Sequence, residues 1–200
     1  DAHSNTGDCT FDVTVIDNED PVITCPPNIT VGNDSGACEA VIAYSNANAT
    51  DNCVMGAPPS CSPASGSTFS IGTHTVICTV EDLAGNTDTC TFEITVNDTT
   101  APSIICPGNI TTDNDSGLCS AVVIFSPTPA DNCPGVQASS IPASGTAFSV
   151  GITTVISTAI DSAGNSSQCS FTVTVNDTAP PIITCPSNII QGNDQDSCGA

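Results

Sequence analysis

The cysteines are the residues of this chain best able to do covalent chemistry, and there are 13 of them among 200 residues. A cysteine can act as a nucleophile, as a metal ligand or as half of a disulfide. A zinc site is disfavoured because the chain has only two histidines, His3 and His74, and no Cys-x-x-Cys motif. The cysteine density therefore predicts a disulfide-bonded protein from an oxidising compartment, either secreted or at the cell surface.

The carboxylates are the second chemical feature, because 21 Asp and Glu residues face no Lys or Arg and the formal net charge is −21. Nucleic acids and anionic membrane surfaces are bound through Lys and Arg, so we expect neither as a partner. Cations are the expected partners. Ca²⁺ comes first because it takes carboxylate and amide oxygens. No other cofactor is expected, and no apolar run approaches the roughly 20 residues that cross a bilayer.

Catalysis is not expected from these side chains. A catalytic site needs one unique arrangement of groups in a cleft, whereas the carboxylates recur at equivalent linker and turn positions. His74 lies on a strand position that should face solvent, and Thr153 replaces it one repeat later. We therefore expect that the chain is not an enzyme and has no catalytic residue.

An internal repeat determines where the cysteines and carboxylates recur along the chain. Segments 17–26, 97–107 and 176–186 match one another, and each ends in Cys-Pro. Matching segments also begin at Cys9, Cys90 and Cys169. A period near 80 residues is too long for a solenoid unit and fits one small β-sandwich. The predicted boundaries are the end of one repeat at 1–17, complete repeats at 18–97 and 98–176, and the start of another at 177–200.

Two segments of the first complete repeat have the alternation typical of half-buried strands. In residues 90–96, every second side chain from Cys90 to Val96 is apolar, and residues 75–82 place Val76, Cys78 and Val80 on one face. The intervening residues 82–86, Asp-Leu-Ala-Gly-Asn, indicate a hairpin turn, with Gly85 and Asn86 suited to positive φ. No helical period is present.

The ordered motifs resemble the HYR (hyalin repeat) family over essentially the whole chain. They are Pro-x-Ile-x-Cys-Pro, Asp-Asn-Cys, Phe-Ser-Ile/Val-Gly-x-x-Thr-Val, Asp-x-Ala-Gly-Asn and Cys-x-Phe-x-Val-Thr-Val. The resemblance implies immunoglobulin-like sandwiches in extracellular proteins, often in long tandem arrays linked to adhesion. We accordingly predict an all-β fold of tandem immunoglobulin-like β-sandwich repeats of about 80 residues, stapled by disulfides.

Three disulfides are predicted, one from the comparison of the repeats and two from the immunoglobulin-like sandwich that the resemblance implies. Cys61 and Cys78 are lost together in the second repeat, where Ser157 replaces Cys78 and either Ser140 or Ile141 replaces Cys61, so we predict Cys61–Cys78. In an immunoglobulin-like sandwich the first and last strands can run parallel and adjacent. That arrangement predicts Cys25–Cys90 in the first repeat and Cys106–Cys169 in the second.

The remaining cysteines are assigned by elimination to Cys38–Cys53 and Cys119–Cys133. This assignment has a geometric difficulty, because a full strand from Cys38 would leave Cys53 roughly 20 Å away, whereas a disulfide needs Cα atoms within about 7 Å. Either the strand is short and the chain doubles back, or Cys38 reaches into the next repeat. The local pair is preferred.

The linkers between repeats contain no Gly/Ser spacer, so we expect a semi-rigid rod. In such a sandwich each linker lies near two loops of the following repeat, which would gather carboxylates into a Ca²⁺ site. Asp and Asn also favour turns by themselves, so the alternative is a purely structural role. The expected Ca²⁺ residues are Asp17, Asp20, Asp51, Asp82, Asp98, Asp131 and Asp161.

The chain carries eight Asn-x-Ser/Thr sequons, which are acceptors for N-glycans in a eukaryotic secretory pathway. The alternative is a polar β-surface without glycan. The candidate asparagines are Asn28, Asn33, Asn48, Asn97, Asn109, Asn114, Asn165 and Asn176.

These observations predict a structural repeat segment of a long extracellular, glycosylated fibre, matrix or surface protein. Its expected partners are neighbouring repeats of the same chain and other copies of itself. Two alternatives remain open. The segment could be a Ca²⁺-dependent adhesion or binding module, or a passive spacer in a large secreted protein.

Overall fold

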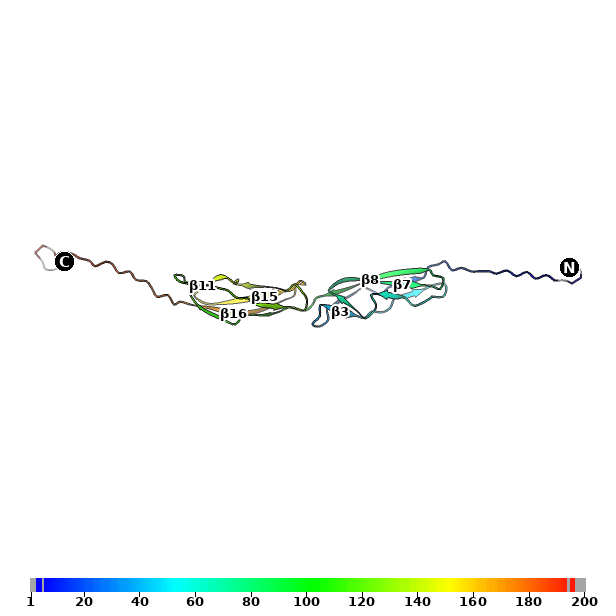
Figure 1. Ribbon diagram of the computed structural model, residues 1–200, viewed down its shortest axis with the longest axis horizontal. Coiled ribbons are helices and arrows are strands. Elements are labelled where there is room, and N and C mark those ends of the chain that lie inside the picture. Colours follow the sequence, from blue (N-terminus) through cyan, green and yellow to red (C-terminus); the bar gives the residue numbers. More distant parts are fainter. Residues whose placement is uncertain (1–2, 5, 194, 197–200) are drawn as a thin grey trace. The chain divides into compact units, whose positions relative to one another are not determined.

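A computed structural model describes residues 3–4, 6–193 and 195–196. These residues form 16 β-strands and no helix, so no helix of the described chain could cross a membrane. The chain divides into two compact units. The first comprises residues up to 103 together with 129–137 and 159–167, and the second comprises 104–128, 138–158 and the residues from 168 onward. Figure 1 labels β3, β7 and β8 in the first repeat and β11, β15 and β16 in the second.

The first repeat contains eight strands in three sheets. β2, β8, β7 and β5 form a four-stranded sheet in that order, while β3 pairs with β6 and β1 pairs with β4. The bounds are β1 Val22–Thr24, β2 Ile29–Gly32, β3 Glu39–Ile42, β4 Asn48–Thr50, β5 Ser60–Ser62, β6 Ser67–Ser70, β7 Gly72–Glu81 and β8 Thr87–Asn97.

The second repeat has the same topology. β10, β16, β15 and β13 form the four-stranded sheet, β11 pairs with β14, and β12 pairs with β9. The bounds are β9 Ser103–Ile105, β10 Ile110–Asp113, β11 Ser120–Val123, β12 Thr128–Ala130, β13 Gln137–Ile141, β14 Thr146–Ser149, β15 Gly151–Ile160 and β16 Ser166–Asn176. Two all-β repeats of immunoglobulin-like type are therefore present, as the sequence predicts.

The first extended segment of each repeat changes sheets midway. In the first repeat, β1 pairs antiparallel with β4, and the chain then passes through Cys25-Pro26-Pro27 before β2 pairs parallel with β8. Two prolines supply no backbone donor, so a ladder cannot continue through them and the strand divides at that point. The first extended segment is thus two short strands.

The cores are formed by the apolar faces of the long hairpin strands. On β8, Phe92, Ile94 and Val96 are buried and their neighbours Thr91 and Glu93 are exposed, which confirms the predicted alternation. Phe171, Val173 and Val175 occupy the matching face of β16. The Tyr44 ring contacts Phe92 edge-on at 5.0 Å, and Phe125 contacts Phe171 at 4.9 Å. Each such buried side chain contributes about 1.5–3 kcal/mol, so cores this thin benefit from disulfides.

The predicted hairpin turn joins β7 and β8. Asp82 N donates to Asn86 O at 3.1 Å, and Gly85 has φ of 95°, a conformation that favours glycine because it has no Cβ. Asn86 is not among the residues with positive φ, so its contribution to the turn comes from its side chain.

Three predicted disulfides are formed. Their Cα–Cα distances are 5.7 Å for Cys25–Cys90, 4.0 Å for Cys61–Cys78 and 5.8 Å for Cys106–Cys169. The parallel register explains the first, because Ile29 is paired with Ile94 and each cysteine precedes its member of that pair by four residues. The same spacing relates Cys106 and Cys169 to Ile110 and Val173.

The predicted pairs Cys38–Cys53 and Cys119–Cys133 are wrong. Cys38 bonds instead to Cys133, with Cα atoms 4.9 Å apart, and Cys53 and Cys119 are exposed and unpaired. Hydrogen bonds hold residue 37 beside the Asn97 end of β8, whereas Val54 bonds to Leu83 at the other end of the hairpin. The 11 residues of β8 span about 36 Å, so Cys38 and Cys53 lie at opposite ends of one repeat. The alternative in which Cys38 reaches the next repeat is correct. Cys198 lies outside the described residues.

Candidate functional site

The candidate site is a group of polar residues around the Cys38–Cys133 disulfide, which we call the 98–133 cluster: Asp98, Asp131, Asn132 and Cys133. All four belong to the first compact unit, as do Ala37 and Cys38. Asn132 Nδ2 donates to Ala37 O at 2.8 Å, one residue before the disulfide. A covalent bond and a hydrogen bond thus hold the same two loops together.

Local turns place the carboxylates of the 98–133 cluster. Asp98 follows β8 directly, and its Oδ1 accepts a hydrogen bond from Thr100 N at 3.1 Å. Asp131 follows β12, and its Oδ2 accepts from Cys133 N at 3.2 Å. Both are Asx turns, in which a short side chain bonds the backbone two residues on. The turns that offered a purely structural explanation for these aspartates are therefore present. Each turn uses only one oxygen of its carboxylate and leaves the other oxygen free of that turn.

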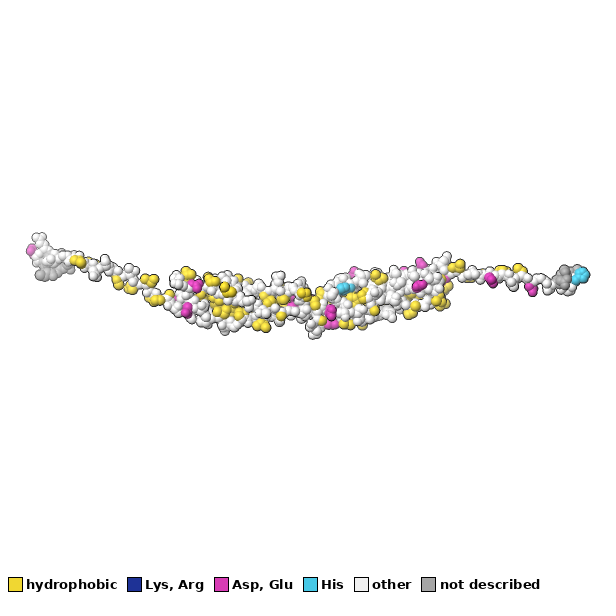
Figure 2. Space-filling view, viewed as in Figure 1, with side chains coloured by type: hydrophobic (Ala, Val, Ile, Leu, Met, Phe, Trp, Pro, Cys, Tyr) yellow, Lys and Arg dark blue, Asp and Glu magenta, His cyan; other side chains and the backbone are white. Residues whose placement is uncertain are grey.

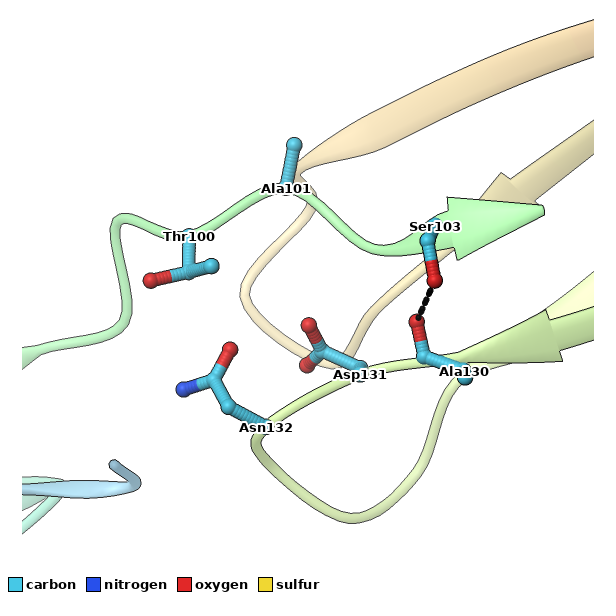
Figure 3. A pocket seen from close by; sticks show the side chains of 6 residues that line it. All are labelled: Thr100, Ala101, Ser103, Ala130, Asp131 and Asn132. Carbon is cyan, nitrogen blue, oxygen red and sulfur yellow. Dashed lines mark hydrogen bonds between the residues drawn. The ribbon is translucent and has the colours of Figure 1, made fainter. Parts of the chain in front are cut away.

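Two oxygens of the 98–133 cluster are buried without a hydrogen-bond partner: Asp131 Oδ1 and Asn132 Oδ1. They come from two side chains that point into a pocket of about 260 Å³ below Thr100 and Ala101 (Figure 3). One ligand atom each of Asp98, Asp131 and Cys133 lie within 4.8 Å of one another. Buried acceptors without donors are costly, and a hard cation would satisfy them. The Cys133 sulfur is bonded to Cys38, so it cannot serve as a thiolate ligand.

Asp82 and Asp161 do not join the expected cation sites, because their own turns use both carboxylate oxygens. Asp161 Oδ1 accepts from Ala163 N and Asn165 N at 2.9 and 2.8 Å, and Oδ2 accepts from Asn165 Nδ2 at 2.8 Å. Asp82 has the matching bonds to its own turn. Burial acts to raise the pKa of each carboxyl, but these hydrogen bonds outweigh it and leave the net pKa below the ordinary value.

Sequence reasoning named Asn86 as a turn residue and Asn165 as a sequon, but it missed the contact that each makes with a linker. The second Nδ2 hydrogen of Asn165 bonds to Asp98 O at 3.1 Å, and Asn86 makes the same contact with Asp17 O at 3.4 Å. Each asparagine therefore ties its hairpin turn to the linker that precedes the repeat. The recurrence of Asn at the end of both Asp-x-Ala-Gly-Asn motifs was the available signal.

An equivalent cluster lies at the start of the first repeat, where one ligand atom each of Asp17, Asp51 and Cys53 lie within 4.8 Å of one another. Cys53 N donates to Asp51 Oδ2 at 3.0 Å. A hydrogen bond to Asp17 first, then burial and the nearby charges, raises the pKa of the Cys53 thiol. Asp20, also expected at this junction, is exposed and is not in the cluster.

A second sulfur group, Cys25, Cys78 and Cys90, also has metal-like spacing, but all three cysteines are disulfide-bonded. In the second repeat Ser157 Oγ and Ser140 Oγ are 2.8 Å apart. This contact shows that Ser140, not Ile141, is the counterpart of Cys61. His74 Nε2 is 2.8 Å from Ser70 O, so its ring is held by the backbone at the end of β6, four residues earlier.

The eight sequons fall into two groups. The exposed group is Asn28, Asn48, Asn97, Asn109 and Asn176, and the partly buried group is Asn33, Asn114 and Asn165. Asn33 Nδ2 donates to Ala37 O at 2.8 Å and to Thr100 Oγ1 at 3.0 Å. N-glycosylation replaces one Nδ2 hydrogen, so Asn33 and Asn165 would each lose a bond that ties a loop to a linker.

The strands, disulfides and repeated clusters define a tandem array of disulfide-bonded, immunoglobulin-like modules. The HYR domain matches residues 16–96 and again residues 97–175, so the chain belongs to the HYR domain family. Two relatives named hyalin support this. The one from Strongylocentrotus purpuratus is 33% identical over 201 residues, and the one from Lytechinus variegatus is 36% identical over 197. Each alignment covers 94% of this chain, but only 17% and 37% of the two relatives.

Solved structures of cadherin type are also similar. Protocadherin Gamma C5 EC1-3 is 15% identical with a TM-score of 0.41, and the match covers 78% of this chain and 68% of that one. Human Protocadherin-24 EC1-2 is 17% identical with a TM-score of 0.38, and the match covers 80% of this chain and all of that one.

Proposed function

We propose that this chain is a structural repeat segment of a long extracellular fibre, matrix or surface protein. One observation carries the proposal: a disulfide joins the loop before β3 of one repeat to the loop after β12 of the next. Only residues 98–102 lie between β8 and β9, with no flexible spacer. A passive spacer needs no covalent bond across its junction, whereas a load-bearing array gains from one.

The same chemistry supports an extracellular location. The four disulfides among the described residues persist only where the environment is oxidising, and the sequons on exposed strands and loops suit glycan attachment in a secretory pathway. Figure 2 shows magenta carboxylates on both repeats and no dark blue Lys or Arg, of which the sequence has none. Such a surface favours contact with cations and other neutralising partners over direct association between bare chains.

Ca²⁺ is proposed as the ligand of the 98–133 cluster. Asp98 and Asp131 would supply carboxylate oxygens and Asn132 its unpartnered amide oxygen. At the other junction Asp17 and Asp51 would act in the same way. Asp20, Asp82 and Asp161 are left out of this proposal, because the first lies outside the cluster and the other two cap their own turns.

Electron microscopy of the secreted full-length protein tests the structural role. Long filaments that persist on dilution are expected for a fibre or matrix component. Isolated monomers that attach to cells or to a carbohydrate only with Ca²⁺ would contradict the proposal and favour the adhesion module. Isolated monomers without any binding would favour the spacer. The Cys38→Ser/Cys133→Ser chain is the matched control for the covalent contribution.

A further inference from the structure

Cys53 and Cys119 occupy the positions whose counterparts form the bond between repeats. Cys38 follows Cys25 by the same number of residues as Cys119 follows Cys106, and each stands directly before the strand that pairs with β6 or β14. Cys53 and Cys133 each end an Asp-Asn-Cys motif. We call Cys38 and Cys119 the outgoing cysteines and Cys53 and Cys133 the incoming cysteines.

The loop that carries the incoming cysteine is built alike in both repeats. The cysteine N–H donates to the aspartate two residues earlier, at 3.0 Å in Cys53 and 3.2 Å in Cys133. The same motif lies beside the preceding linker aspartate, Asp17 or Asp98, and that aspartate is tied to its hairpin turn by Asn86 or Asn165. Cys53 thus has the setting of Cys133 although it has no disulfide partner.

The loop that carries the outgoing cysteine is also built alike. Asn33 Nδ2 donates to the carbonyl just before Cys38 at 2.8 Å, and Asn114 Nδ2 donates to the carbonyl before Cys119 at 2.7 Å. The cysteine carbonyls accept from Ile71 N at 3.4 Å and from Val150 N at 3.1 Å. The Cys119 loop therefore keeps the bonded conformation without a disulfide, so little further ordering is needed to form one.

Exposure distinguishes the two incoming cysteines from each other, and likewise the two outgoing cysteines. Cys133 is only 8% exposed beside its disulfide partner, whereas Cys53 is exposed. Cys38 is partly buried and Cys119 is exposed. The bonded cysteines are covered by the loop of the adjoining repeat, and the free cysteines are not. This accounts for the difference in exposure, because the loops are otherwise built alike.

We propose that every junction of the array carries one disulfide, from the outgoing cysteine of a repeat to the incoming cysteine of the next. Cys53 then bonds to an outgoing cysteine that precedes this segment, and Cys119 bonds to an incoming cysteine that follows it. Two thiols become one disulfide as an oxidising protein or peptide disulfide accepts the two electrons and two protons and leaves as two thiols. The inference needs the tandem array of the proposed function but not its role as a fibre.

Two lengthened chains test the proposal, and both contain the complete sequence. The first inserts a second copy of residues 98–176 after Asn176, which gives Cys119 an incoming cysteine with the natural linker. The second inserts a second copy of residues 17–97 after Asn97, which gives one Cys53 an outgoing cysteine. Each is secreted from a eukaryotic cell, alkylated without reduction and cleaved at Asp and Glu, since there is no Lys or Arg for trypsin. Linked peptides are then identified by mass spectrometry.

In the first chain we expect Cys119 of the original copy to be linked to Cys133 of the added copy. The alkylated fraction of the Cys119 peptide should fall from nearly complete to about half, because Cys119 of the added copy still has no incoming cysteine. In the second chain the added Cys53 should be linked to Cys38 of the preceding copy. Cys119→Ser in the first chain should free the added Cys133 and leave Cys106–Cys169 intact, which separates loss of the bond from misfolding. Full alkylation of both Cys119 copies in a chain whose other disulfides are intact would overturn the proposal, as would a bond inside one repeat or between molecules. Filaments are not involved in this readout, so the two proposals can fail separately.

Discussion

Asp82 and Asp161 illustrate how one side chain can organise a hairpin. Each accepts backbone and side-chain hydrogen bonds from its own Asp-x-Ala-Gly-Asn turn while lying almost fully buried, at 4% and 7% exposure. The asparagine that closes the turn also donates a hydrogen bond to the preceding linker. A single acidic residue therefore connects the strand turn to the junction between repeats.

The pH dependence of stability should reflect these two carboxyls. Their pKa values are lowered in the folded chain, so the unfolded chain binds more protons as the pH falls. The free energy of unfolding should be constant near neutrality, begin to fall as the pH approaches the ordinary Asp value of about 3.9, and decrease until the lowered folded value is passed. Denaturant unfolding between pH 7 and pH 2 measures this.

Asp161→Asn should lower stability at pH 7 and flatten the acid dependence of the second repeat. The exposed Asp113, changed to Asn, is the matched control and should leave both unchanged. An unaltered acid dependence in the Asp161→Asn chain would show that other carboxyls cause it.

Glycan occupancy should follow the two groups of sequons. Asn109 Oδ1 accepts from Thr172 N at 2.9 Å, an acceptor role that a glycan on Nδ2 preserves, whereas Asn165 uses both Nδ2 hydrogens. We expect high occupancy at Asn109 and little at Asn165. Enzymatic deglycosylation in H₂¹⁸O labels each occupied asparagine for mass spectrometry. Equal labelling of the two sites would contradict this account.

The paired strands β5–β7 and β13–β15 differ in one cross-strand contact. Cys61 and Cys78 are partners in the antiparallel register and form a disulfide, while the matching Ser140 and Ser157 face each other at 2.8 Å in the second repeat. The serine pair keeps the buried hydroxyl of Ser157 satisfied without a covalent bond. This pair of strand positions therefore accepts either a disulfide or a hydrogen bond between two serines.

Exchanging the cysteine pair and the serine pair between the repeats should shift the stability of the two repeats in opposite directions. Ser140→Cys/Ser157→Cys should form a disulfide that stabilises the second repeat by about 3 kcal/mol, as expected for a loop of this size. Cys61→Ser/Cys78→Ser should destabilise the first repeat by a similar amount. Thermal unfolding followed by circular dichroism, with and without reductant, measures both. A Ser140→Cys/Ser157→Cys chain that keeps two free thiols would contradict the assigned register.

For the whole molecule, charge and covalent bonding act together. The net charge of −21 opposes compaction, and the Cys38–Cys133 bond closes a loop of 95 residues. A loop of that length corresponds to about 4–5 kcal/mol of stabilisation through the unfolded state. The bond thus offsets part of the repulsion where Asp98 and Asp131 approach each other.

Ca²⁺ should stabilise the folded chain if the 98–133 cluster binds it. At about 100 times the dissociation constant, binding adds about 2.7 kcal/mol to the free energy of unfolding. Asp131→Asn should weaken Ca²⁺ binding while its amide oxygen still caps Cys133 N, and Asp113→Asn again serves as control. Calorimetric titration and thermal unfolding in Ca²⁺ or chelator measure the effect. No shift at millimolar Ca²⁺ would contradict a cation site here.

The sequence alone determined the features that depend on neighbours along the chain. Period-2 alternation identified the buried faces of residues 75–82 and 90–96, and Asp-Leu-Ala-Gly-Asn identified the turn between them. Comparing two repeats identified Cys61–Cys78, because a bond must lose both cysteines at once. The sequence also placed Asp98 near Asp131, since both residues follow strands that end at one junction.

Only the tertiary structure decided the partners of residues far apart in the chain. Cys38 bonds Cys133, not Cys53, because β8 separates the two ends of a repeat by more than a disulfide can span. Asp161 was assigned to the cation site but caps its own turn, whereas the side chain of Asn132 faces the pocket. The direction of a side chain at a turn is set by which donors the fold brings within about 3 Å, and residue types in sequence do not specify that.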